Sequence, residues 1–213
     1  HVAVRRQRQM CIRDRVDSEF HVTDSFLKKK GFEKGTMHLV DSDEQTNLLN
    51  SLEKEYGKPS LACGGSATNT IFAASILGSS CSYICKVGND KNGNFYLDDL
   101  SDAGVNIDHS VMLDSNINSG TCTVMVSPDA ERTMSTCLGI SSDLSATDVA
   151  DEIFNDSKLM YLEGYMMSGD DSYDACMEAI RLAKSKNVQI AFTLSDPNLS
   201  LIHISEPTRP IAI

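Results

Sequence analysis

From Gly64 onward, apolar residues follow helical spacing in some segments and form short strand-like runs in others. The helical segments begin near residues that cap helices and end near glycine or lysine. The expected helices are 66–77, 92–103, a segment that starts at Ser145 or Thr147 and passes through Phe154, and 171–184. The expected strands are 81–87, 158–163 and 188–193. Helices and strands that alternate over short connections predict a mostly parallel sheet with covering helices.

Two stretches break this rhythm. The stretch 119–136 alternates between apolar and polar residues on either side of the turn-forming cluster Ser127–Glu131, which predicts a β-hairpin. The stretch 20–40 contains turn glycines at Gly31 and Gly35 and is expected to supply further strand or a short helix. Together they predict a small separate sheet.

The two ends of the chain differ in composition from the middle. Five of the eight arginines lie in the first fifteen residues, whereas 16–198 contain only two. Neither an apolar secretory core nor a serine-rich transit pattern is present at the start. The segments 6–14 and 199–210 resemble translated sequencing-adapter read-through. We therefore predict that 1–15 and 199–213 are tails foreign to the protein, and that 16–198 carry the fold.

Charge and cysteine content narrow the class of protein. The formal net charge of −11 disfavours nucleic acid as a partner, because a phosphate backbone is bound chiefly through lysine and arginine. No apolar run is long enough to span a membrane. The seven cysteines form no C-x-x-C pair, which is typical of reduced thiols in a cytoplasmic protein. Cys81 and Cys85 have a spacing that a metal could use, but no histidine lies nearby, so no metal site is expected.

The segment Gly64-Gly-Ser-Ala-Thr-Asn69 directly precedes an expected helix. Glycines there would let a ligand approach the backbone, and the start of a helix offers free N–H groups. Taken alone, the pair of glycines fits a tight turn as well as an anion or polyol site. A dinucleotide site is disfavoured, because the sequence lacks G-x-G-x-x-G after a strand.

Three motifs occur in a fixed order: Gly64-Gly-x-x-x-Asn69 with Gly78, then Val87-Gly-Asn-Asp-x-x-Gly93, then Leu100-x-x-x-Gly104. Their order and spacing resemble the N-terminal signature of the ribokinase-like (PfkB) family of carbohydrate and nucleoside kinases. The stretches 129–133 and 161–165 resemble its adenosine-kinase-like branch. The resemblance implies a three-layer α/β/α fold with a mostly parallel sheet and a small β-sheet lid, built from about 20–40 and 119–136.

The resemblance also implies roles for residues that match the motifs. Asp17 would hold sugar hydroxyls, Gly64 and Gly65 would lie against the sugar, and Asn69 would bond its hydroxyls. Glu163, at the end of a strand, resembles a second acidic sugar contact.

The alternative for Glu163 is a solvated strand end. Arg132 lies beside the lid hairpin and could contact substrate or phosphate, or be an ordinary surface arginine.

By resemblance, the family transfers phosphate from ATP, with Mg²⁺, to a primary hydroxyl of a sugar or nucleoside, and a homodimer through the lid is a candidate assembly. Its catalytic aspartate lies in a Gly-Ala-Gly-Asp motif, which this sequence does not contain. We therefore expect an incomplete, inactive kinase portion that stops before the ATP-binding part. The alternative is a sugar- or nucleoside-binding module without catalysis.

Overall fold

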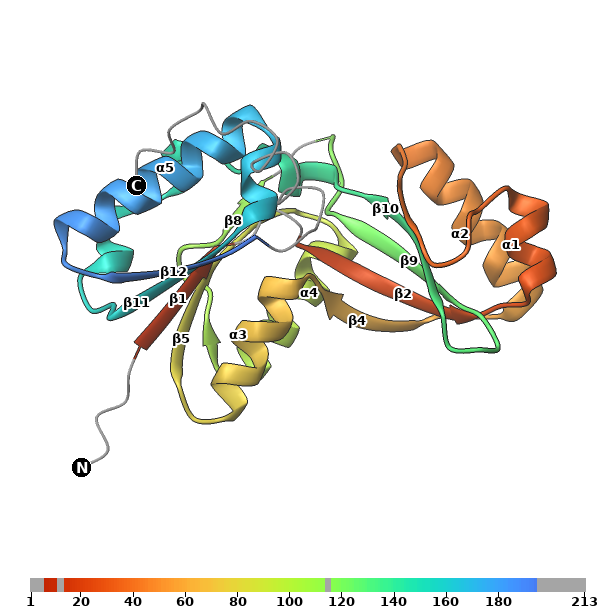
Figure 1. Ribbon diagram of the computed structural model, residues 1–213, viewed down its shortest axis with the longest axis horizontal. Helices are drawn as coiled ribbons and strands as arrows, with labels where there is room; N and C mark the ends of the chain where they lie inside the picture. The colour runs from red at the N-terminus through yellow and green to blue at the C-terminus, as the bar shows by residue number, and fades with distance from the viewer. Residues whose placement is uncertain (1–5, 11–13, 114–115, 195–213) are drawn as a thin grey trace.

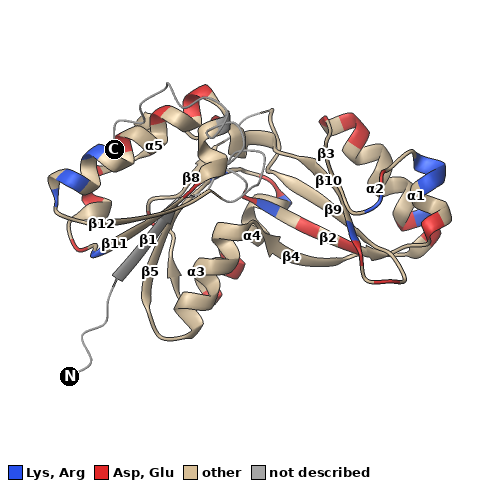
Figure 2. Cartoon of the chain, viewed as in Figure 1, with Lys and Arg blue, Asp and Glu red and all other residues tan. Residues whose placement is uncertain are grey.

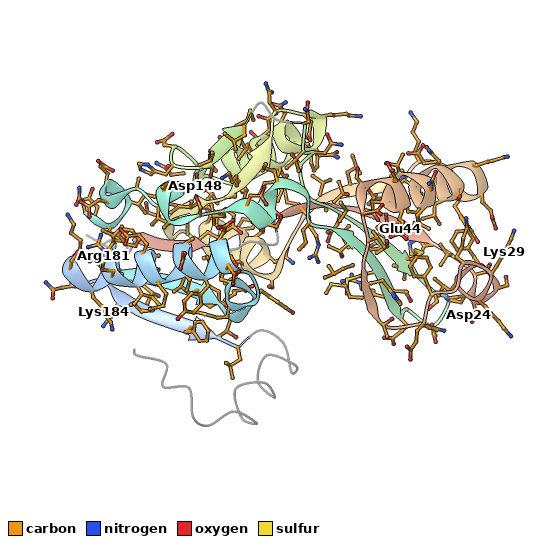
Figure 3. The ribbon with its side chains drawn as sticks, turned by 90° about the horizontal axis from the view of Figure 1, so that it is seen from above. Asp24, Lys29, Glu44, Asp148, Arg181 and Lys184 are labelled. Atoms are coloured by element: carbon orange, nitrogen blue, oxygen red, sulfur yellow. The ribbon has the colours of Figure 1, made fainter. Side chains whose placement is uncertain are left out.

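In the computed structural model, residues 6–10, 14–113 and 116–194 are described; they form two five-stranded sheets placed side by side (Figure 1) and one two-stranded sheet. Viewed from above, one half carries the labelled Asp148, Arg181 and Lys184, and the other carries Asp24 and Glu44 (Figure 3). The long charged side chains surround both halves, as expected for residues that stay solvated.

The first sheet contains five parallel strands, and its neighbours pair in register. In spatial order they are β12 (Gln189–Thr193), β11 (Leu159–Glu163), β1 (Arg6–Met10), β5 (Ser80–Ile84) and β7 (Val105–Asn106). Helices α3 (Ser66–Ile76) and α4 (Lys91–Asp102) cover one face, and α5 (Asp170–Ser185) covers the other (Figure 1). This is the expected three-layer α/β/α arrangement.

Because side chains alternate in direction along β5, this strand contributes to the apolar clusters on both faces of the first sheet. Tyr83 packs into the apolar cluster beneath α3 and α4, whereas Ile84 packs into the cluster beneath α5. Successive side chains of a strand point to opposite faces, so a strand buried on both sides reads as a continuous apolar run. The cluster beneath α5 also contains Leu162 and Ala179, both fully buried.

The second sheet, which we call the lid sheet, has mixed pairing and only one covered face. In spatial order its strands are β3 (Met37–Leu39), β10 (Arg132–Cys137), β9 (Thr121–Val126), β2 (Arg15–His21) and β4 (Ser60–Gly64). Helices α1 (Asp24–Lys30) and α2 (Ser42–Tyr56) pack on that face through a cluster that includes Phe20, Leu52 and Met125. The expected hairpin of 119–136 is confirmed as β9 and β10.

Most expected elements are confirmed, two differ, and one helix was not expected. The strand expected over 81–87 is broken at Cys85, because β5 pairs with β1 whereas β6 (Lys86–Gly88) pairs with β8 (Val111–Leu113). The long helix α2 was missed, although Asp41 and Glu44 form a capping box at its start. The helix expected from Ser145 through Phe154 is wrong.

That segment contains short 3-10 turns, Ala146–Asp148 and Asp151–Phe154, instead of an α-helix. The carboxylate of Asp148 accepts from the backbone and hydroxyl of Ser145 and from Lys86, which closes one turn tightly. Val149 then adopts an extended backbone, so the helix cannot continue.

Part of the segment 1–15 lies inside the first sheet, because Arg6–Met10 forms β1 between β11 and β5. The foreign origin of 1–15 stays a prediction, and 199–213 lie outside the described residues. Among the described residues, no helix has both the length and the apolar character needed to cross a membrane.

Candidate functional site

Asp17 and Gly64 meet where β2 and β4 run antiparallel. Arg15 pairs with Gly64 and Asp17 pairs with Ala62 in the register of the two strands. An ideal Cβ placed on Gly64 would lie 2.0 Å from Asp17 Oδ1, so any side chain at position 64 would displace the carboxylate. The sequence therefore uses glycine here for close approach, and the structure brings these two predicted residues into direct contact.

The carboxylate of Asp17 is partly shielded from solvent and paired. Arg15 Nε lies 3.1 Å from Asp17 Oδ1, with the two side chains 12% and 26% exposed. Burial raises the pKa of Asp17, and the positive charges of Arg15 and Arg132 oppose that rise. Along β2, one basic and two acidic residues alternate with uncharged residues (Figure 2). An acceptor in this setting can bind hydroxyl groups while part of it still faces solvent.

Arg132 is exposed at the first position of β10. Cys122 of β9 pairs with both Asp17 and Thr136, and Arg132 lies four residues before Thr136 on the same strand. Because side chains alternate along a strand, Arg132 shares the open face of the lid sheet with Asp17. The structure thus places Arg132 on the same face, four residue pairs further along the strands.

Gly65 and Asn69 lie in the first turn of α3. Gly65 is the N-cap residue, with φ 111°, and the helix has no side-chain cap. Neither Ser66 nor Thr68 caps this helix: Thr68 is buried and bonds Tyr83 OH, and Ser66 Oγ donates to Glu163. Asn69 is exposed, and its N–H donates to Gly65 O at 3.0 Å. The start of α3 therefore keeps backbone donors without side-chain caps beside Gly64.

Glu163 ends β11 and is 1% exposed. Ser66 Oγ donates to Glu163 Oε2 at 2.5 Å, and Tyr161 OH donates to Oε1 at 3.4 Å. The alternative of a solvated strand end is therefore wrong. The bond from Ser66 ties the carboxyl end of β11 to the glycine segment, while direct contact between Glu163 and a sugar stays a prediction.

Sequence reasoning missed a buried polar cluster beneath α3. Tyr83 OH and Tyr96 OH donate to Asp14 Oδ1 at 2.5 Å and 3.0 Å, and both tyrosines also bond Thr68. Burial raises the pKa of Asp14 from 3.8 to about 8. Nothing in the sequence signals this cluster, because the partners are far apart along the chain and Asp14 falls in the segment set aside as a tail.

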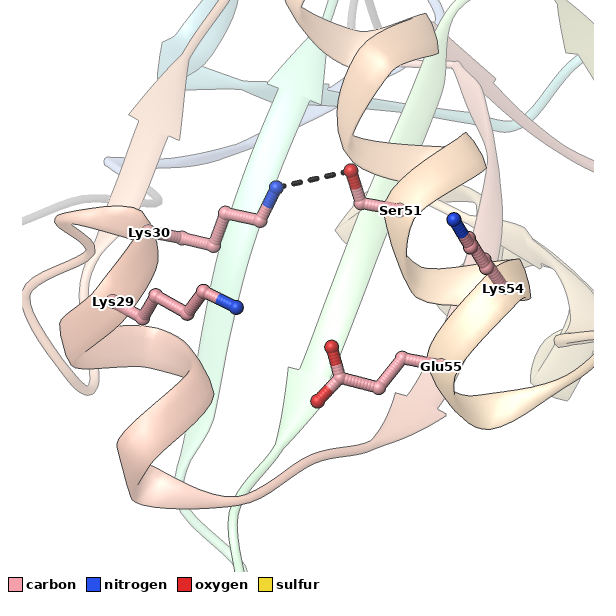
Figure 4. A pocket seen from close by; sticks show the side chains of 5 residues that line it. All are labelled: Lys29, Lys30, Ser51, Lys54 and Glu55. Carbon is pink, nitrogen blue, oxygen red and sulfur yellow. Dashed lines mark hydrogen bonds between the residues drawn. The ribbon is translucent and has the colours of Figure 1, made fainter.

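A surface hollow of about 380 Å³ lies between α1 and α2, on the covered side of the lid sheet (Figure 4). It is lined by Lys29, Lys30, Ser51, Lys54 and Glu55. The lysines stand at the rim, and Lys30 donates to Ser51 Oγ at 3.0 Å. These helices pack on the opposite face from Asp17, so the hollow is not the candidate site.

Within the described part of the chain, no three His, Cys, Asp or Glu side chains gather in a way that could hold a metal ion. Burial raises the pKa of Cys81 to about 11 and that of Cys176 to about 12, so these thiols stay protonated at neutral pH. The described residues therefore offer hydrogen bonds and close backbone approach rather than a metal centre.

Comparison with known proteins defines the class. The model of the pfkB family of carbohydrate kinases matches residues 36–206, and the chain belongs to this family. Adenosine kinase from Sinorhizobium meliloti superposes with a TM-score of 0.82 at 32% identity, covering 96% of this chain and 61% of that one. A probable sugar kinase from Rhizobium etli gives a TM-score of 0.80 at 26% identity, covering 95% of this chain and 60% of the other.

Among curated relatives, guanosine-inosine kinase from Escherichia coli is 24% identical over 184 residues, which are 84% of this chain and 42% of that protein. Ribokinase from Dictyostelium discoideum is 30% identical over 127 residues, which are 58% of this chain and 38% of that one. The chain thus spans under half the length of these curated relatives. The resemblance drawn from the glycine motifs is confirmed at the level of the family and the fold.

Proposed function

We propose that this chain is the acceptor-binding part of an ATP-dependent phosphotransferase that acts on the primary hydroxyl of a sugar or nucleoside. The observation that carries the proposal is the contact of the Asp17 carboxylate with Gly64, beside the uncapped start of α3. Family membership supplies the reaction class, and the geometry supplies a place where hydroxyl groups can be held.

Each part of this arrangement suits a polyol. A carboxylate accepts from two neighbouring hydroxyl groups, which matches the vicinal diol of a ribose. Gly64 leaves room for the Asp17 carboxylate, and Gly65 keeps the start of α3 without a side chain, so a sugar ring held by that carboxylate would lie against the chain. Asn69, exposed one turn into α3, can both donate and accept. In this role the residues orient the acceptor, and orientation supplies much of the rate in phosphoryl transfer.

The open face of the lid sheet favours a nucleoside over a free sugar. By strand alternation, Cys122, Val124 and Met134 share this face with Asp17; Cys122 and Val124 are buried there, whereas Met134, which pairs with Val124, is half-buried. A partly exposed apolar side chain such as Met134, on the face of a hydroxyl-binding carboxylate, fits a flat base attached to a ribose. The similarity to an adenosine kinase and to a guanosine-inosine kinase supports the same choice.

ATP and Mg²⁺ are implied by the family, and ATP would supply the transferred phosphoryl group. The described residues form no cluster that fits a metal ion, so we assign them no step with either group. The role proposed for this chain is confined to binding and orienting the acceptor and, through the lid sheet, to excluding water from it.

Asp17→Asn tests the proposal by titration calorimetry of adenosine and ribose into the chain. Loss of a charged hydrogen bond should weaken adenosine binding by about 1–3 kcal/mol. Gly64→Ala should weaken it through displacement of the same carboxylate. The matched control is Glu19→Gln, because Glu19 occupies the same face of β2 two residues further on and pairs with His21. Equal affinities for wild type and Asp17→Asn would remove Asp17 from the site.

The second candidate is a sugar- or nucleoside-binding module without catalysis, which the same contact between Asp17 and Gly64 would serve. A longer protein that contains this chain and a Gly-Ala-Gly-Asp segment separates the two. Turnover of adenosine with ATP and Mg²⁺ supports the kinase, whereas binding without turnover supports the module.

A homodimer through the lid sheet is a further proposal. Its edge strands β3 and β4 carry Leu39 and Leu61, which are 59% and 43% exposed. Edge strands with apolar side chains can pair with another chain. Light scattering on the chain and on Leu61→Lys measures the assembly directly, and a monomeric wild type would exclude it. A cytoplasmic location likewise stays a prediction.

A further inference from the structure

The chain passes between the two sheets at several places, and glycines pack backbone against backbone there. A Cβ on Gly120 would lie 2.4 Å from Asp14 O, and one on Gly139 would lie 2.2 Å from Asn118 O. Only glycine tolerates such approach. These crossings, which include 118–120 before β9 and 138–140 after β10, determine how the lid sheet sits on the first sheet.

Asp90 joins the crossing 118–120 to the start of α4. Its Oδ1 accepts from Gly93 N at 2.8 Å, as an N-cap should, and its Oδ2 accepts from Ser119 N at 2.7 Å. Ser119 is 4% exposed, and Gly88 N donates to Ser119 Oγ at 2.9 Å. A Cβ on Gly93 would lie 2.1 Å from Gly88 O. The motif Val87-Gly-Asn-Asp-x-x-Gly93 is therefore a joint between α4 and the lid sheet.

The joint lies one residue from Asp17, the carboxylate proposed to bind the acceptor. Val16 N donates to Gly120 O at 3.0 Å, and Val16 directly precedes Asp17. On the other side, Ile140 N donates to Asn118 O at 2.9 Å, which brings the end of β10 into the same set of bonds. A shift of 118–120 would move β2 with it.

We propose that Asp90 is a positioning residue. Through Ser119 and Gly120 it fixes the start of β2, and so holds the Asp17 carboxylate against Gly64. The part of this inference that concerns the substrate rests on the proposed function, whereas the mechanical part does not. Asp90 itself touches no acceptor in this scheme.

Asp90→Asn separates the two bonds of this side chain. Asparagine is as good an N-cap as aspartate, so the bond to Gly93 is kept. Its NH₂ group cannot accept from Ser119 N, so the joint is lost. Asp41→Asn is the matched control: Asp41 caps α2 rather than α4, and accepts from Glu44 N at 2.8 Å. Asp90→Ser is a second variant that keeps the cap, for use if the asparagine variant does not fold.

Backbone amide hydrogen exchange is the first measurement. Loss of a charge-assisted bond should speed exchange about tenfold in 16–20 and 121–124, with little change in β11. Asp41→Asn should leave both regions as in wild type. Faster exchange confined to α4, or no change in 16–20, would overturn the proposal, because Asp90 would then be only a cap.

Adenosine affinity, measured well below the unfolding temperature, is the second measurement. Asp90→Asn should weaken binding about 5- to 20-fold, and Asp41→Asn should not, even if both lower Tm equally. A purely structural role would lower Tm and leave the affinity unchanged, which would also overturn the proposal. If wild type binds neither adenosine nor ribose, the proposed function fails, and the exchange comparison alone decides the role of Asp90.

Discussion

Two carboxylates near the junction of the two sheets lie in opposite environments. In the first sheet all strands are parallel and helices cover both faces, whereas the lid sheet has mixed pairing and one open face. Asp14, at the boundary beneath α3, is 2% exposed, and its Oδ2 has no hydrogen-bond partner among the described residues. Asp17, three residues later, is paired with Arg15 and reaches the open face. A charged carboxylate is therefore costly at the buried position of Asp14, whereas Asp17 on the open face can stay charged and bind a ligand.

The largest effect is expected for Asp14→Asn. The native pKa of Asp14, about 8, lies above its ordinary value of 3.8, so the folded state keeps a proton that the unfolded state loses. Stability is therefore fully present below about pH 4 and falls as the pH rises towards 8. Asparagine keeps the acceptor for Tyr83 and Tyr96 and cannot ionise. It should stabilise the fold by on the order of 3–5 kcal/mol at pH 8 and little at pH 4.

Urea unfolding at pH 4, 6 and 8 measures this directly. Asp102→Asn, at an exposed position of α4, is the control and should show no such dependence on pH. An equal difference between wild type and Asp14→Asn at all three pH values would show that Asp14 is not desolvated in the native state.

The sequence predicted the parts of this molecule that depend on local pattern. The helices α3, α4 and α5 and the hairpin follow from apolar spacing and glycine stops, and the family follows from glycine motifs whose backbone contacts need no side chain. It did not predict features that depend on distant partners. The bonds from Ser66 to Glu163 and from Asp90 to Ser119 join segments that only the fold brings together.

The missed helix α2 has a different cause. Its capping box at Asp41 and its apolar Leu48 and Leu52 were readable, but the stretch is highly charged and lies before the first family motif. At 145–154 the opposite happened: an α-helix was expected and none formed. There Ser145, one of the two starts expected, is an N-cap, but the turn that it begins ends at Asp148, which Lys86 binds from a distant part of the chain.

The second effect concerns the middle of the first sheet. Strand β1 has the sequence Arg-Gln-Arg-Gln-Met, although it lies between β11 and β5 in a sheet covered on both faces. Central parallel strands are normally continuous apolar runs. Replacing the four polar residues by Val-Ile-Val-Ile should raise the free energy of unfolding by about 2–4 kcal/mol. If these residues were native to the protein, we expect no such rise in the free energy of unfolding. This variant therefore also tests the foreign origin predicted for 1–15.

Thermal and urea unfolding give the comparison, with Gln189→Val on the edge strand β12 as the control. The control should change stability little, because that position is exposed. A less stable β1 variant would mean that the polar residues have partners in the fold, and would count against the predicted tail.

The smallest effect lies in the covered face of the lid sheet, where one polar group is fully satisfied. Gln45 of α2 is 3% exposed, and its Nε2 donates to Thr123 Oγ1 at 3.1 Å and to Ser135 O at 3.2 Å. Its Oε1 accepts from Ser135 Oγ at 2.9 Å. Gln45→Leu should cost about 1–2 kcal/mol, because it leaves both hydroxyl groups buried without this partner. Adding Thr123→Val and Ser135→Ala should recover most of that loss, since an apolar set of similar shape needs no hydrogen bonds. If the triple variant is less stable than Gln45→Leu alone, the Gln45 amide does not offset the cost of burying these two hydroxyl groups. The contrast between satisfied and unsatisfied polar groups then does not extend to this face.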